Sequence, residues 1–350
     1  MKVVYVFLAL LTVQTGFSQN SEFSELLDFY QSEKQFNGVV LVATNGTIDF
    51  LAAKGLANRE TNTALSTDSK FKIASVSKVF TAILIMKLVE EQKLLLNGTL
   101  AESLPEYTGA GKDQITIYNL LTYSSGIDNQ LEREGIKPYQ NIKTLDAFIE
   151  TYCSRDLVYT PGAKSVYGNT EYILLHKIIE KVTGMTYENY LHQIILEPLG
   201  LKNTQITKAR DIVPGLAQSY TYDEETQKLY NDAPYYPELY FGSGALYATA
   251  EDLLKLDQTL FNAQILNQQT TQQLLEIHPE LGNTAFGFWG SSGWGSFEEP
   301  FYYRTGGILG STANWIHTTE KGKTIIVLSN TDATNLYEFS EKLYQLSLKQ

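Results

Sequence analysis

The sequence predicts an α/β fold of the α+β kind: an antiparallel sheet flanked by helices, built from both chain ends, with a mostly helical segment inserted between them. Three observations predict it. Two β-rich runs flank Asn45-Gly46, residues 311–330 repeat the pattern near the other end, and the middle of the chain has helical periodicity. We therefore expect a sheet domain over residues 19–72 and 280–350, a mostly helical domain over 73–279, and a functional site between the two.

The first eighteen residues have the layout of a secretory signal peptide. Lys2 gives a positive start, residues 3–13 are an apolar run, and Gly16 and Ser18 are small residues suited to cleavage near Ser18. A buried N-terminal strand is the alternative interpretation. The run is too short to span a membrane, and no later segment has ~18 uninterrupted apolar residues. We expect an exported chain, periplasmic or secreted, without a membrane span.

The elements follow in order. The run "GVVLVATNGTIDFLAAKG" from Gly38 predicts a hairpin, because Asn-Gly favours a tight turn between strands. The run "STANWIHTTEKGKTIIVLSN" predicts a second hairpin that turns at residues 320–322. The spacing of apolar residues, with glycine or a loop at the ends, predicts helices. These cover residues 76–96, 115–126, 170–184, 186–200, 249–261 and 335–348.

Composition narrows the classes of function. Without the leader, which carries Lys2 as its only charge, the 27 basic and 39 acidic residues become 26 and 39, a net charge of −13. Such an acidic chain lacks the basic surface that nucleic acids require. The single cysteine, Cys153, cannot form an internal disulfide. The four histidines show no zinc-ligand spacing, so we expect no metal and no cofactor.

A serine and a lysine three positions apart occur twice, as Ser69 with Lys72 and as Ser75 with Lys78. Ser75 stands where a long helix is predicted to begin, and residues three apart lie on one helix face, so its hydroxyl and the Lys78 amine can meet. A lysine buried there can accept the serine proton, and the helix N-terminus favours a developing oxyanion. The alternative is a helix cap beside a solvated lysine.

Two further motifs follow in the chain. Tyr-x-Asn occurs three times, at Tyr139, Tyr167 and Tyr187. The last falls within a predicted helix, where residues two apart point to different sides. The first lies in a loop after a proline and stays open. Tyr167 with Asn169 directly precedes a helix. A basic residue before Thr-Gly occurs once, at Arg304-Thr305; a turn entering an edge strand is its alternative interpretation.

Taken in order, Ser-x-x-Lys, Tyr-x-Asn and basic-Thr-Gly resemble the three motifs of the serine β-lactamase and penicillin-binding protein superfamily. Its nearest branch here holds class C β-lactamases, D-alanyl-D-alanine carboxypeptidases and related esterases. The likeness covers nearly the whole mature chain, including "FKIASVSKVFTA", "YTPGAKSVYGNTEYILL" and "SGALYATAEDLLKL". The Tyr167 motif is preferred because it follows a Pro-Gly turn and precedes a helix, as in that superfamily.

The resemblance implies a role for each motif residue. Ser75 would be the nucleophile, Lys78 and Tyr167 would share the general-base work, and Asn169 would bind the substrate amide or orient Lys78. Backbone N–H groups of Ser75 and Gly307 would form the oxyanion hole. Thr305 would contact the substrate. Arg304, where relatives carry lysine or histidine, keeps the charge to bind a substrate carboxylate but cannot exchange a proton.

These expectations lead to a serine hydrolase that acts through a Ser75 acyl-enzyme. The substrate would be a peptide, amide or ester, such as a D-Ala-D-Ala peptide from peptidoglycan, a small ester or a β-lactam. The alternative is a binding or sensor protein that acylates with little turnover. A Ser-His-Asp hydrolase is a third hypothesis, against which stands the absence of a Gly-x-Ser-x-Gly motif. Aromatic residues in 234–247 and 287–303 either line the cleft or pack the core.

Overall fold

A six-stranded antiparallel sheet forms the centre of the molecule in the computed structural model, which describes residues 21–293 and 295–349. The expected signal peptide lies outside these residues. The strand order is β10-β11-β12-β13-β1-β2, and all six strands come from the two end segments of the chain. The predicted α+β fold class is therefore confirmed. The strands are β1 (Gly38–Thr44), β2 (Thr47–Lys54), β10 (Trp289–Ser291), β11 (Phe301–Ile308), β12 (Ser311–Thr318) and β13 (Lys323–Ser329).

The predicted hairpins join β1 to β2 and β12 to β13. Asn45 has φ 47° and Gly46 has φ 80°, the left-handed pair that a type I′ turn needs. The two chain ends meet in the middle of the sheet, where β1 pairs with β13 from Gly38 opposite Ser329 to Thr44 opposite Lys323. Both strands are buried almost throughout, because helices cover both faces of the sheet.

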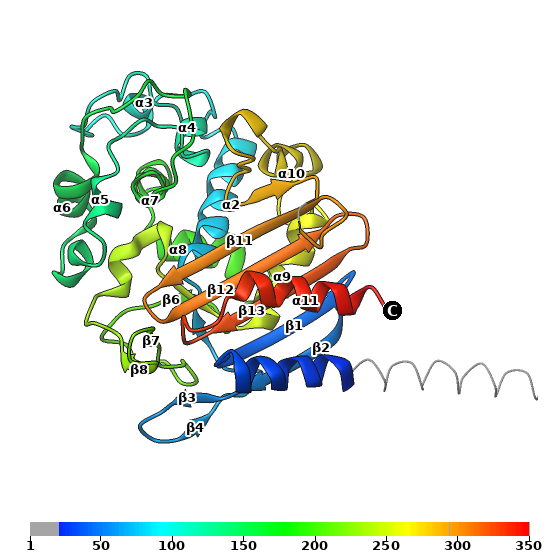
Figure 1. Cartoon of the computed structure of the whole chain (residues 1–350). Helices are drawn as coiled ribbons and strands as arrows, with labels where there is room; N and C mark the ends of the chain where they lie inside the picture. The colour runs from blue at the N-terminus through cyan, green and yellow to red at the C-terminus, as the bar shows by residue number, and fades with distance from the viewer. Residues whose placement is uncertain (1–20, 294, 350) are drawn as a thin grey trace, which may run out of the picture.

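Helices cover the two faces of this sheet (Figure 1). The helix over residues 21–33 and α11 (Leu336–Ser347) lie on one face, where Phe23 and Phe339 pack with Val40 and Val327. On the other face, α9 (Ala250–Phe261) packs against β13 and β1. A helix from the central segment thus covers the face opposite to the one that the two terminal helices cover.

The central segment holds most of the helices. Besides α9 they are α2 (Ser77–Glu90), α3 (Leu100–Ser103), α4 (Ile117–Leu121), α5 (Gln130–Arg133), α6 (Leu145–Phe148), α7 (Thr170–Thr183), α8 (Tyr187–Leu191) and α10 (Gln268–Leu275). Short 3-10 helices lie at η1 (Ala74–Val76), η2 (Lys137–Gln140), η5 (Pro237–Ser243, kinked at Phe241) and η6 (Pro279–Leu281), and π-helical turns at η3 (Ile149–Cys153) and η4 (His192–Leu196).

Short strands complete the chain outside the large sheet. They are β3 (Leu56–Asn58), β4 (Thr63–Ala64), β5 (Phe71–Lys72), β6 (Gln205–Ile206), β7 (Tyr220–Asp223), β8 (Lys228–Asn231) and β9 (Leu246–Ala248). β9 pairs with both β5 and β6, so it ties the strand before Ser75 to the central segment.

Helix ends differ from the predictions in three places. The helix expected over residues 115–126 covers only Ile117–Leu121. The helix expected over residues 76–96 ends at Glu90, because Gln92 has φ 56° and reverses the chain so that Leu94 packs into the core. The helix expected over residues 186–200 ends at Leu191 and continues as a π-helical turn. Residues 170–184 match the prediction, and Gly184 ends that helix at φ 69°.

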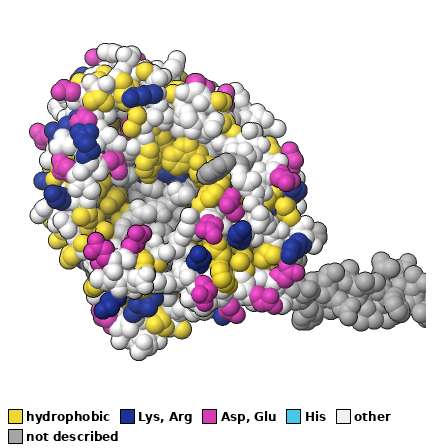
Figure 2. Space-filling view, in the orientation of Figure 1, with side chains coloured by type: hydrophobic (Ala, Val, Ile, Leu, Met, Phe, Trp, Pro, Cys, Tyr) yellow, Lys and Arg dark blue, Asp and Glu magenta, His cyan; other side chains and the backbone are white. Residues whose placement is uncertain are grey.

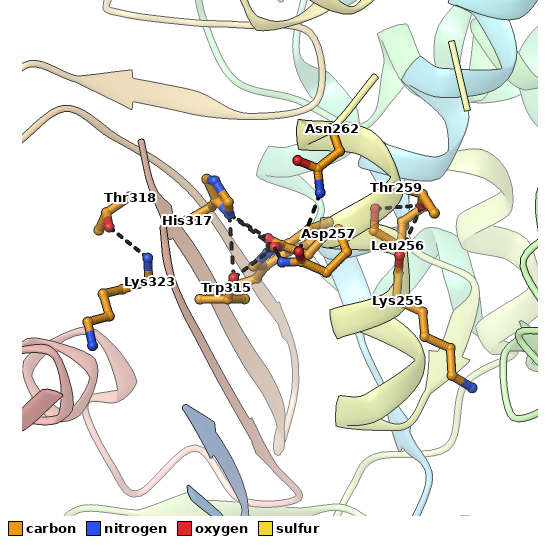
Figure 3. A network of polar contacts seen from close by, with 11 residues as sticks. Lys255, Leu256, Asp257, Thr259, Asn262, Trp315, His317, Thr318 and Lys323 are labelled. Carbon is orange, nitrogen blue, oxygen red and sulfur yellow. Dashed lines mark hydrogen bonds and ion pairs between the residues drawn. The ribbon is translucent and has the colours of Figure 1, made fainter. Parts of the chain in front are cut away.

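A buried carboxyl group fastens α9 to the sheet. Asp257 accepts hydrogen bonds from Trp315 Nε1 (2.7 Å) and Thr324 Oγ1 (2.7 Å), and its Oδ2 lies 3.0 Å from His317 Nδ1 (Figure 3). The His317 ring also stacks on Phe261, with ring centroids 3.6 Å apart. Asp257 is fully buried, so these partners replace the water that it loses on folding.

We expect Asp257→Asn to lower the free energy of unfolding by about 2–4 kcal/mol, because an amide cannot accept all three donors and leaves buried N–H or O–H groups without partners. Urea unfolding followed by circular dichroism measures this change. The exposed Asp113→Asn variant is the control and should lie within about 0.5 kcal/mol of the wild type. Equal stability of the two variants would contradict the assigned role.

Candidate active site

Ser75 lies in the 3-10 turn η1, directly before α2, on a strained backbone. The preceding residue, Ala74, has φ 46°, a left-handed conformation that costs a non-glycine residue about 1–3 kcal/mol. β11 packs under this turn, and a Cβ on Gly306 would come within 2.3 Å of the Ile73 carbonyl oxygen. Only glycine therefore allows the strand to approach Ser75 so closely. The Ser75 side chain caps no helix, so its hydroxyl remains available.

The Lys78 ammonium is fully buried and lies among four acceptors. Its Nζ is 3.1 Å from Ser75 Oγ, 2.9 Å from Tyr167 OH, 2.6 Å from Asn169 Oδ1 and 2.8 Å from the Ser243 carbonyl oxygen. Burial lowers the pKa of Lys78, and the nearby Arg304 charge lowers it further, while Tyr167 opposes the shift. A lysine in this state can take part in proton transfer.

The Tyr167 hydroxyl lies 2.6 Å from Ser75 Oγ, and 38% of the surface of this residue is exposed. Burial by itself raises the pKa of this phenol. The positive charges of Lys78 and Arg304 outweigh burial and lower the pKa of Tyr167 overall. The arrangement can therefore hold a phenolate within hydrogen-bond reach of a serine hydroxyl.

Arg304 is buried, with 0% of its surface exposed. Its Nε donates to the Ser75 carbonyl oxygen (2.9 Å), one terminal nitrogen to Tyr123 OH (2.9 Å) and the other to Tyr167 OH (3.2 Å). The Trp289 ring lies 4.7 Å from the guanidinium carbon. The guanidinium is thus held between Ser75, Tyr123 and Tyr167, and its binding of a substrate carboxylate stays a prediction.

Thr305 and Gly307 lie on the open edge of β11 and are both exposed. The Thr319 N–H donates to the Pro300 carbonyl oxygen, which fixes the hydrogen-bond register between β11 and β12. In this register the N–H and C=O groups of even-numbered β11 residues point to β12. Those of Thr305 and Gly307 point to the opposite edge of β11. β10 pairs only with residues 301–303 there. The Gly307 N–H thus has no backbone partner within the described part of the chain. Figure 2 shows a hollow bordered by hydrophobic side chains between the sheet and the central helices.

The other Ser-x-x-Lys pair is not assembled. Ser69 Oγ accepts from the Ser66 backbone N–H (2.9 Å), within its own turn. Lys72 points elsewhere and donates to Ser219 Oγ (2.7 Å) and Tyr235 OH (3.2 Å). Among the described residues, no hydrogen bond joins Ser69 to Lys72. Of the two pairs with the same spacing, only Ser75 and Lys78 are joined by a hydrogen bond in the described part of the chain.

The other two Tyr-x-Asn tyrosines have structural roles. Tyr187 OH lies 2.7 Å from Thr81 Oγ1 inside the core. Tyr139 OH accepts from Asn169 Nδ2 at 3.3 Å, so it stands behind the site without reaching Ser75. His317, of the third hypothesis, forms a pair with Asp257, but in the described chain no hydrogen bond joins it to a serine.

Sequence reasoning missed three groups that contribute to the site. The Ser243 carbonyl oxygen accepts a hydrogen bond from Lys78, and the Tyr123 hydroxyl accepts one from Arg304. The Glu132 carboxylate accepts one from the Asn169 backbone N–H at 2.8 Å. A backbone carbonyl carries no residue-type signal. Phe241, with φ 46° and ψ −137°, kinks the segment before Ser243, and such strain cannot be read from the letters alone.

The described residues contain no cluster of three or more His, Cys, Asp or Glu side chains that could hold a metal ion. Among the helices of residues 21–293 and 295–349, none combines the length and apolar character needed to cross a bilayer.

The chain belongs to the Beta-lactamase family, whose family model matches residues 22–349. It is 27% identical over 322 residues to a putative penicillin-binding protein, PbpX, of Bacillus subtilis (strain 168), covering 91% of this chain and 76% of the relative. It is 26% identical over 249 residues to a teichoic acid D-alanine hydrolase of Staphylococcus aureus, covering 71% of this chain and 60% of that relative.

A solved structure with a similar fold is the D-amino acid amidase of Ochrobactrum anthropi SV3. The TM-score is 0.82 at 20% identity, and the match covers 95% of this chain and 99% of that one. At this identity the likeness concerns the fold alone. Family membership and the names of the curated relatives support a hydrolase of the amide or ester type.

A buried carboxyl group beside the site makes stability depend on pH. Glu171, in the first turn of α7, accepts from Ser125 Oγ at 2.7 Å, and burial raises the pKa of Glu171 to about 7. The folded state therefore keeps a proton that the unfolded state releases above its pKa of about 4.5. The contribution of Glu171 to the free energy of unfolding is therefore fully present below about pH 4.5 and is lost as the pH rises to about 7.

We expect Glu171→Gln to be more stable than the wild type at pH 8 by about 1–3 kcal/mol and to match it near pH 4, because the amide keeps the bond to Ser125 without an ionisable group. Urea unfolding at both pH values tests this. Glu150→Gln, at an exposed position, should change stability little at either pH. A stabilisation by Glu171→Gln that is independent of pH would contradict the assignment.

Proposed function

We propose that this protein is an exported serine hydrolase that cleaves a peptide, amide or ester through an acyl-enzyme on Ser75. One observation carries the proposal. The Ser75 hydroxyl lies 2.6 Å from a Tyr167 phenol that two buried cations hold at a lowered pKa. An activated serine next to its base is the arrangement that nucleophilic catalysis requires.

In the first half-reaction, Ser75 Oγ attacks the substrate carbonyl carbon while its proton passes to Tyr167, with Lys78 sharing the proton. The tetrahedral intermediate then collapses: the bond from carbon to the leaving nitrogen or oxygen breaks, and the leaving atom takes the proton. In the second half-reaction, water loses a proton to the same pair and its oxygen attacks the ester carbon. The bond from this carbon to Ser75 Oγ then breaks, Oγ takes the proton back from the pair, and the acid is released.

The developing oxyanion lies between two backbone N–H groups, those of Ser75 and Gly307. The free edge of β11 supports this role, since the Gly307 N–H points away from β12 and a side chain there would meet open space. Each such donor contributes on the order of 10²–10³ in rate. Thr305, on the same exposed edge, contacts the substrate alongside it.

Arg304 and Asn169 hold the base in place. Arg304 lies on the sheet side of Tyr167 and lowers the pKa of its phenol. We assign it this role in place of the carboxylate binding that its motif suggested. Asn169 accepts from Lys78, and its amide nitrogen is held by Tyr139. The reaction needs no cofactor, because every proton transfer uses side chains of this chain and water.

The relatives support two versions of this activity. One is named a teichoic acid D-alanine hydrolase, which favours hydrolysis of an ester or amide. Another is named a penicillin-binding protein, which favours a protein that acylates with little turnover. A steady-state rate that continues beyond a single-turnover burst distinguishes the hydrolase from the binding protein.

We expect Ser75→Ala to abolish covalent labelling by a fluorescent fluorophosphonate or penicillin, because the bond-forming oxygen is removed. Intact-protein mass spectrometry with peptide mapping locates the adduct. Ser69→Ala, the matched control from the other Ser-x-x-Lys pair, should label as the wild type does. An adduct that follows Ser69 would overturn the site assignment.

We expect Arg304→Gln to raise the pKa of Tyr167, since one of the two cations that lower it is gone. The acid limb of the kcat/KM profile should move to higher pH by about one unit, and activity at pH 7 should fall about tenfold. Thermal unfolding separates this effect from loss of fold. An unchanged profile in a folded variant would show that Arg304 does not act on the base.

A further inference from the structure

A groove lies beside α10, near the start of β11 and five residues before Gly307 on that strand. It has a volume of about 1020 Å³ and is bordered by the end of α9, the outer side of α10 and Tyr302. Tyr302 OH donates to the Leu275 carbonyl oxygen at 2.8 Å, which ties the strand to the end of α10 (Figure 1). Of the described residues that line the groove, none belongs to the Ser75 site.

Carboxamide side chains dominate the lining of this groove. α10 buries Thr270 and Leu274 against the protein, so its glutamines lie on the outer side. The carboxamide residues of the lining are Asn262, Gln268, Gln269, Gln272 and Gln273. In the described chain, no protein group forms a hydrogen bond with the side-chain amide of any of the four glutamines. Each of these amides can therefore donate two hydrogen bonds and accept others from a ligand.

The groove carries almost no charge. Among the described residues that line it, Glu276 is the one charged side chain, and no lysine or arginine is present. A phosphate, a carboxylate or another anion would find no cation to pair with there. The lining thus favours a neutral ligand that forms many hydrogen bonds.

Two aromatic rings add an apolar surface to the groove. Phe261 and Tyr302 are both partly exposed, and their ring centroids are 5.5 Å apart. His317 stacks on Phe261 at 3.6 Å and is itself held by Asp257, so the Phe261 ring is fixed before a ligand arrives. A rigid ring of this kind packs against a flat apolar group at little cost in conformational entropy.

A neutral sugar chain meets both requirements. Each sugar hydroxyl both donates and accepts, as a carboxamide does, and the C–H faces of a pyranose ring pack on aromatic rings. A peptide is usually bound as an added strand at a free sheet edge. At Tyr302, however, β11 is paired on both sides, with Gly290 of β10 and with His317 of β12. The strand that borders the groove therefore has no free edge there for a peptide.

We propose that this groove binds a neutral oligosaccharide through the four glutamine amides and the rings of Phe261 and Tyr302. The site is separate from Ser75 and does not depend on the proposed function. Tyr302 and Thr305 lie three residues apart on β11, which corresponds to roughly 10 Å at the rise of a strand. A glycan held in the groove would thus keep groups attached to it close to the Ser75 site.

The test measures the binding of two neutral hexasaccharides, cellohexaose and chitohexaose, by isothermal titration calorimetry. We expect at least one of them to bind the wild type with a Kd between about 10 μM and 1 mM, because an open groove gives weak affinity. The double variant Gln269→Ala/Gln272→Ala removes two neighbouring amides from one helix face, and alanine preserves the helix. We expect it to weaken binding by about tenfold or more.

Gln264→Ala is the matched control, since Gln264 is exposed between α9 and α10 but does not line the groove. It should bind the sugar as the wild type does. Equal binding by the wild type and the double variant would overturn the proposal, and so would the absence of binding of both hexasaccharides at about 1 mM. Tighter binding of the neutral hexapeptide Gly-Ser-Gly-Ser-Gly-Ser than of either sugar would identify a peptide site instead.

Labelling of Ser75 by a fluorophosphonate, measured on the same proteins, keeps the two proposals apart. The double variant should label as the wild type does, because neither glutamine belongs to the candidate catalytic groups. Sugar binding that is blocked by labelling Ser75 and kept in the double variant would place the sugar in the catalytic cleft and overturn the groove assignment. A wild type that binds the sugar but does not label contradicts the serine hydrolase alone.

Discussion

The burial of the Lys78 ammonium is the constraint on which the rest of the site depends. Moving a charged amine out of water costs several kcal/mol unless polar groups replace its hydration. Four acceptors surround it, from the turn before α2, the loop before α7 and the kinked η5 segment. Each of these segments must be in place for the charge to be tolerated, so folding and assembly of the candidate catalytic groups are one event.

Arg304 adds a second buried positive charge from the sheet side. Two cations converge on the Tyr167 phenol, and the low polarity around them strengthens their effect on its pKa. Tyr123 and Trp289 take the place of water around the guanidinium.

Local and distant contacts differed in how far they could be predicted. The Asn45-Gly46 hairpin, the helix ending at Gly184 and the reach of Lys78 to Ser75 depend on residues close in sequence, and all three are present. Local context and the family resemblance favoured Tyr167 among the three Tyr-x-Asn motifs, but its contacts with Ser75 and Lys78 join residues about ninety positions apart. The motif that indicated Arg304 places it beside Ser75, whereas its contacts with Tyr123 and Tyr167 depend on segments far away in the sequence.

The sequence by itself determined the fold class, the family and the small set of residues from which the site is drawn, because turn chemistry, periodicity and motif order are local properties of the chain. Only the tertiary structure decided that Ser75 and not Ser69 meets a lysine, that the Arg304 guanidinium is buried against Tyr123 and Tyr167, and that Glu132 accepts the Asn169 N–H. The physical reason is that burial and side-chain direction depend on which distant segments pack together, and those contacts leave no pattern in neighbouring residues.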